Sequence, residues 1–119
     1  MPIVKVWGLP PDLRGGLYVL ASELAGILLE IKELGLENKD DVLVFFPADM
    51  REKALGREIF IEVSLVKRPA RSYDVLQRVA KVLGTALQTV CREAKVVCFV
   101  QMYASNQGFW SSEFKHERL

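Results

Sequence analysis

Residues 1–7, with the sequence MPIVKVW, open the chain and decide how its fold is interpreted. The β-branched residues between Ile3 and Trp7 predict a short strand. Pro2 stands directly before this strand, where its missing N–H breaks no hydrogen bond of a sheet. The sequence therefore predicts a proline at the start of the first strand.

The residues after this strand have the spacing of a helix. Leucine and isoleucine recur at alternating intervals of four and three, at Leu13, Leu17, Leu20, Leu24, Ile27, Ile31 and Leu34. This spacing predicts one apolar stripe on a helix of about six turns. Gly35 predicts its end. The nearly all-apolar run Val42–Pro47 predicts a second strand covered on both faces.

The second half of the chain repeats this order. Glu58–Val66 alternates apolar and other residues with the period of a strand. Ser72 is a natural N-cap for a second helix. Its buried stripe is expected at Val75, Val79, Val82 or Leu83, Ala86 and Val90. Lys95–Met102 predicts a fourth strand.

The fold class predicted is α/β (α+β), with two β-α-β units in one domain. Residues 1–50 form the first unit, residues 57–102 the second and residues 103–119 a C-terminal tail. Each unit should hold its strands parallel through a right-handed crossover. The product is a four-stranded mixed sheet with two long helices on one face. The same element order also fits the ferredoxin-like fold.

The other face of this sheet has no covering element in the sequence. Leaving several hundred Å² of apolar surface in water is unfavourable, at roughly 25 cal/mol per Å². Phe109, Trp110 and Phe114 in the tail also need a surface to cover. We therefore expect a homo-oligomer.

Composition excludes several classes of partner and site. A net charge of +1 without a long basic run argues against nucleic acid. No apolar stretch is long enough to cross a membrane, and no basic leader precedes Ile3. Cys91 and Cys98 indicate reduced thiols in a cytoplasmic protein. The single histidine, His116, lies in the polar tail, so no metal site is expected.

Pro2 is the candidate catalytic residue. Once Met1 is trimmed, its nitrogen is a secondary amine that can move a proton between atoms of a substrate. It must be neutral near pH 7, and both an apolar pocket and nearby cations lower the pKa of an amine. The cations that the sequence offers, which could also hold a substrate carboxylate, are Arg51, Lys67, Arg68 and Arg71.

Two further stretches carry a resemblance to a known family. Arg71-Ser72-Tyr73 opens the second helix, and Ala104–Phe109 has an Asn-x-Gly-aromatic pattern. Together with the Met-Pro start and the doubled β-α-β order, they resemble the tautomerase superfamily. The resemblance is to macrophage migration inhibitory factor and 5-carboxymethyl-2-hydroxymuconate isomerase. Val96 and Cys98 replace a tyrosine and an asparagine of the former.

The resemblance implies a cofactor-independent isomerase that interconverts keto and enol forms of a small carboxylate-bearing substrate. It implies Pro2 as general base and acid, Arg71 as an anion binder with Arg68 as its competitor, and Lys39 near the position of a pocket lysine. It also implies a homotrimer. The alternative is a non-catalytic oligomeric binding module, on this fold or on a ferredoxin-like one, with Pro2 merely starting a strand and the arginines solvated.

Overall fold

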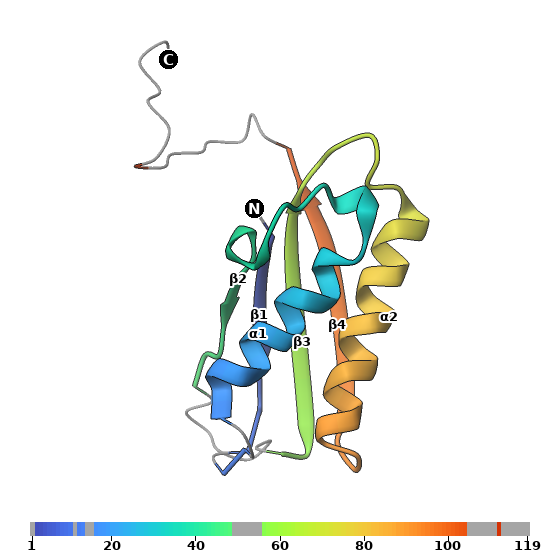
Figure 1. Ribbon diagram of the computed structural model, residues 1–119. Coiled ribbons are helices and arrows are strands. Elements are labelled where there is room, and N and C mark those ends of the chain that lie inside the picture. Colours follow the sequence, from blue (N-terminus) through green and yellow to red (C-terminus); the bar gives the residue numbers. More distant parts are fainter. Residues whose placement is uncertain (1, 11, 14–15, 49–55, 105–111, 113–119) are drawn as a thin grey trace.

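The computed structural model describes residues 2–10, 12–13, 16–48, 56–104 and 112 (Figure 1). Its elements, in chain order, are β1 (Ile3–Trp7), α1 (Gly16–Leu29), η1 (Lys32–Leu34), η2 (Lys39–Asp41), β2 (Leu43–Phe45), β3 (Glu58–Val66), α2 (Tyr73–Val90) and β4 (Lys95–Tyr103). The predicted bounds of the first and third strands are confirmed. Both strands combine β-branched residues with a clear two-residue period.

The four strands form one mixed sheet in the order β2-β1-β3-β4. β1 is parallel to β2, β3 is parallel to β4, and β1 and β3 join the two units as an antiparallel pair. The two strands of each β-α-β unit are therefore neighbours. The ferredoxin-like alternative is wrong, because that fold splits the parallel strands of a unit.

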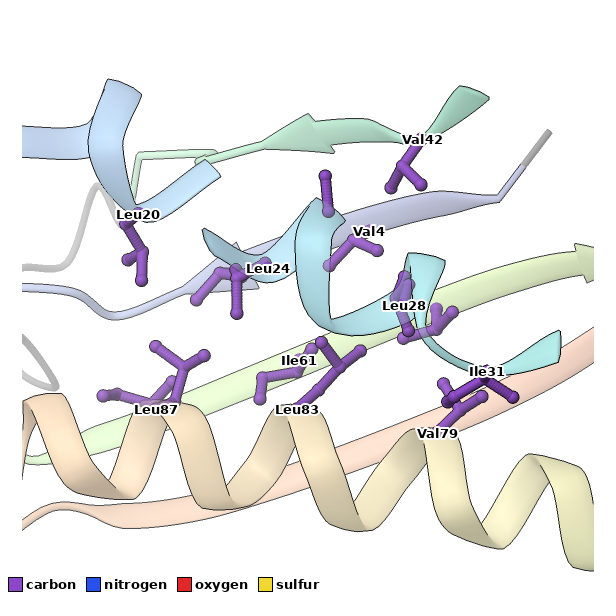
Figure 2. Packing of buried hydrophobic residues seen from close by; sticks show 14 of the residues in the cluster. Val4, Leu20, Leu24, Leu28, Ile31, Val42, Ile61, Val79, Leu83 and Leu87 are labelled. Carbon is purple, nitrogen blue, oxygen red and sulfur yellow. The ribbon is translucent and has the colours of Figure 1, made fainter. Parts of the chain in front are cut away.

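Both helices cover the same face of the sheet, as predicted (Figure 1). Alternate residues of the strands, such as Val4 and Ile61, point into the layer between sheet and helices (Figure 2). Leu24 and Leu28 of α1 and Leu83 of α2 meet them there and are fully buried. Burying each such side chain contributes about 1.5–3 kcal/mol, so this layer is the main source of stability.

The first helix is shorter than predicted, since α1 ends at Leu29 and is 14 residues long. Ile31 has extended backbone angles, and a separate 3-10 turn follows before Gly35, which adopts a left-handed conformation with φ 68°. The apolar spacing nevertheless continues, because Ile31 and Leu34 reach the core from outside the helix. Spacing alone could not reveal this break.

Two burial predictions are also corrected. The buried stripe of α2 is Val75, Val79, Leu83 and Leu87, whereas Val90 is exposed. Leu83, not Val82, continues the stripe because the buried residues recur every four positions along this helix. In β2, Leu43 and Phe45 are exposed, so this strand is covered on one face only within the chain.

Within the described residues, no helix has both the length and the apolar composition needed to cross a membrane.

Candidate active site

Pro2 lies at one edge of the sheet, where β1 and β2 begin and β3 and β4 end (Figure 1). We call this the proline edge. Pro2 is buried, and its carbonyl oxygen accepts a hydrogen bond of 3.0 Å from the backbone N–H of Leu43. The next residue, Ile3, pairs with Leu43 on one side and Ser64 on the other. Pro2 thus stands at the start of a central strand, β1, which is flanked by β2 and β3.

Arg71 belongs to the turn that leaves β3 at the same edge, and it is 3% exposed. Its Nη1 donates to the carbonyl oxygen of Val66 at 2.7 Å, and its Nη2 donates to that of Leu34 at 2.9 Å. Nε is buried without a hydrogen-bond partner. Burial, with the nearby Arg68 charge as a second cause, lowers the pKa of the Arg71 guanidinium. Arg71 therefore ties the second unit to the turn after α1.

Arg68 stands on the same turn and is exposed. Its carbonyl oxygen accepts a hydrogen bond of 3.0 Å from the backbone N–H of Arg71. Within the described residues its guanidinium has no hydrogen bond or ion pair. Arg68 is therefore an exposed cation at the proline edge whose guanidinium no described residue engages.

Lys39 lies on η2, just before β2, and its ammonium donates to Ser22 Oγ of α1 at 2.9 Å. The turn is fixed by Asn38 Oδ1, which accepts from the N–H of Asp40 at 2.8 Å. Asp41 Oδ2 accepts from the N–H of Glu37 at 2.7 Å. The backbone N–H groups of Glu37 and Asn38, which both donate to Asp41 Oδ2, lower the pKa of the Asp41 carboxyl.

Lys67, which follows β3 directly, is exposed, and its backbone N–H donates to the carbonyl oxygen of Tyr103 at 2.8 Å. Arg51 lies outside the described residues.

Other chemistry finds little support here. No group of three or more histidine, cysteine or acidic residues that could hold a metal ion exists among the described residues. The thiols of Cys91 and Cys98 are free. Burial raises the pKa of both, that of Cys98 to about 11, so neither is a reactive thiolate at neutral pH.

A polar pair that the sequence analysis missed lies on the helix-free face of the sheet. Trp7 Nε1 donates to Glu62 Oε1 at 2.7 Å. Both residues occupy outward positions on the antiparallel neighbours β1 and β3. The strand periods predicted these positions, but only the register of β1 on β3 brings the two side chains together.

Comparison with known proteins gives the class of fold. Neither a protein-family model nor a curated protein sequence matches this chain. Solved structures do. A domain of unknown function (DUF1904) from Sebaldella termitidis is similar with a TM-score of 0.61 and 18% identity, over 92% of this chain and 95% of that one. Malonate semialdehyde decarboxylase is similar with a TM-score of 0.59 and 14% identity, over 92% of this chain and 89% of that one.

A macrophage migration inhibitory factor homologue from Prochlorococcus marinus is similar with a TM-score of 0.53 and 13% identity, over 92% of this chain and 95% of that one. These neighbours, with the sheet order and the two covering helices, define the tautomerase fold. The predicted resemblance to the tautomerase superfamily is confirmed at the level of the fold.

Proposed function

We propose that this protein is a keto–enol isomerase of a small carboxylate-bearing substrate, with the Pro2 nitrogen as general base and acid. The observation that carries the proposal is the burial of Pro2 at an edge where Arg68 is exposed. An apolar environment and a nearby cation both favour the neutral amine. A neutral secondary amine can take a proton from carbon and return it to oxygen, and this chemistry needs no cofactor.

The cations at this edge have different proposed roles. Arg68 meets the substrate carboxylate, because its guanidinium is exposed and suited to two-pronged binding. Arg71 holds the turn that carries Arg68, and it adds positive charge from beneath that turn. Lys39 contributes positive charge from η2, where its ammonium donates to Ser22 Oγ. Arg51 stays a candidate on the sequence alone.

We also propose that the protein works as a homotrimer in the cytoplasm. A fused 4-OT with the same fold is described as an asymmetric trimer, at a TM-score of 0.53. The helix-free face of the sheet exposes Leu43, Phe45 and Phe99, which a neighbouring copy would cover. The free thiols of Cys91 and Cys98 fit a reducing compartment.

The test measures exchange of hydrogen for deuterium at the carbon next to the carbonyl of small α-keto acids. The protein begins at Pro2, with Met1 removed and confirmed by mass spectrometry. We expect Pro2→Ala to lower the exchange rate by about 10²–10⁴-fold, the usual contribution of a general base. Pro10→Ala, a change of the same kind away from the proline edge, should leave the rate unchanged. Equal rates for the Pro2→Ala and parent proteins would leave only the non-catalytic module.

A further inference from the structure

The helix-free face of the sheet, here called the open face, carries exposed apolar residues and two opposed charges at its centre. Its outward residues are Ile3, Lys5 and Trp7 of β1, Leu43 and Phe45 of β2, Glu58, Phe60, Glu62, Ser64 and Val66 of β3, and Lys95, Val97, Phe99, Gln101 and Tyr103 of β4. Five of the apolar ones are 37–61% exposed. Such a surface is typical of a protein interface, whose core buries aromatic residues.

The two central charges lie in one row across the sheet. Lys5 pairs with Phe45 of β2 on one side and with Glu62 of β3 on the other, and Glu62 pairs in turn with Phe99 of β4. A cation and an anion therefore stand side by side between two exposed aromatic rings. The Phe99 ring also packs on Phe60, with centroids 5.6 Å apart.

These charges do not neutralise each other within the chain. Lys5 and Glu62 form no ion pair, although their strands place them opposite each other. Glu62 Oε1 instead accepts from Trp7 Nε1, which fixes the carboxylate and leaves Oε2 free. Lys5 borders a hollow of about 370 Å³ that is otherwise lined by Phe45, Phe46 and Pro47. Both charges are thus available to a partner.

We propose that the occupant of the open face is a second copy of this chain, and that Lys5 of each copy pairs with Glu62 of the next. One copy offers both charges, so a ring of copies uses every Lys5 and every Glu62 once. Apolar contact supplies the affinity, and the ion pair fixes register, because a shifted copy leaves both charges desolvated and unpaired. This inference rests on the homotrimer of the proposed function.

The test measures oligomeric state by analytical ultracentrifugation and native mass spectrometry. Lys5→Glu and Glu62→Lys should each weaken assembly by at least about tenfold in concentration, since each places like charges together. The matched controls Lys81→Glu and Glu30→Lys make the same changes at exposed sites away from the open face and should assemble like the parent.

Mixing the two open-face variants separates a pair between copies from a pair within one copy. When a Lys5→Glu copy meets a Glu62→Lys copy, position 5 of each faces an opposite charge at position 62 of the other. Within any single variant chain, positions 5 and 62 still carry like charges. The mixture should therefore associate, with every oligomer containing both variants. A ring of three copies made from two variants contains two copies of the same variant, and the contact between these two places like charges together. Complexes of two unlike copies should therefore be more abundant than rings of three. A mixture that stays as dissociated as its components overturns the proposal.

A measurement on the unaltered chain covers the case in which a variant fails to fold. ¹⁵N-labelled and unlabelled proteins are refolded together and treated with a zero-length carbodiimide cross-linker. Cross-linked Lys5–Glu62 peptides of mixed isotope are expected, and peptides of like isotope only, or none, overturn the pair. A trimer that persists in both variants contradicts the ion pair alone. A monomeric parent protein contradicts the homotrimer as well as the ion pair. If Pro2→Ala loses turnover but still assembles, that result concerns the catalytic role of Pro2 and leaves the ion pair unaffected.

Discussion

Arg71 is the residue to which the structure adds a second role. The family resemblance implies an anion binder, and each terminal nitrogen of its guanidinium donates to a carbonyl oxygen of its own chain. No pattern of residues could show this, because the acceptors are backbone atoms of Val66 and Leu34. The guanidinium is buried without an acidic partner in the described residues, so its hydrogen bonds are what make its burial tolerable.

We therefore predict that Arg71→Met destabilises the fold by roughly 1–3 kcal/mol, the cost of leaving buried carbonyls unsatisfied. Urea unfolding followed by circular dichroism measures the change. Arg68→Met on the same turn is the control and should shift stability by no more than about 0.5 kcal/mol, since its side chain is exposed. If Arg71→Met left the free energy of unfolding unchanged, the two hydrogen bonds of Arg71 would make no net contribution to stability.

Cys98 gives a prediction about pH. Burial raises the pKa of its thiol from 9.0 to about 11. A raised folded-state pKa means that the unfolded chain loses the proton first, so the stabilising contribution is complete below pH 9 and falls as the pH rises towards 11. Unfolding at pH 7 and at pH 10.5 should show a smaller loss of stability in Cys98→Val than in the parent. Equal losses would mean that the folded thiol titrates like a free one.

At the scale of the elements, the strands were more predictable than the first helix. β1 and β3 alternate between a buried and an outward face, and this period marks their bounds. α1 also has apolar residues outside the predicted stripe, such as the exposed Tyr18 and Val19, so the stripe does not mark where the helix begins or ends. α2 has charged residues on its outer side, and its N-cap, Ser72, was predicted correctly.

Gly8, which follows β1, should tolerate no side chain. Its φ is 86°, and a Cβ atom there would lie 2.1 Å from the carbonyl oxygen of Glu58. Gly8→Ala combines a left-handed residue, at about 1–2 kcal/mol, with an overpacked contact between β1 and β3, at about 1–3 kcal/mol. We predict a loss of about 3 kcal/mol or more in thermal or urea unfolding.

Gly84 is the matched control for Gly8, because a Cβ atom there meets nothing within 4 Å and the residue lies inside α2. Gly84→Ala should stabilise the protein by about 1 kcal/mol through helix propensity. If both alanine variants changed stability by the same amount, the close approach of Gly8 to β3 would be incorrect.

At the scale of the molecule, the position of the candidate site follows from the topology. The sequence predicted two β-α-β units, and such units bring the start of β1 and the turn after β3 to one edge of the sheet. The placement of Pro2, Arg68 and Arg71 at one edge was predictable for this reason. The opposed charges of the open face were not predictable from the sequence, because only the antiparallel register of β1 on β3 places Lys5 opposite Glu62.

The central claim is that the nitrogen of Pro2 is a neutral base in the folded protein. The most direct measurement is a ¹⁵N NMR titration of that nitrogen in protein that begins at Pro2, labelled at proline only. We expect a pKa well below the range of an ordinary chain-terminal amine, about 7.7–8.0. A nitrogen that titrates within or above that range would contradict it, because the amine would then be protonated when the substrate binds.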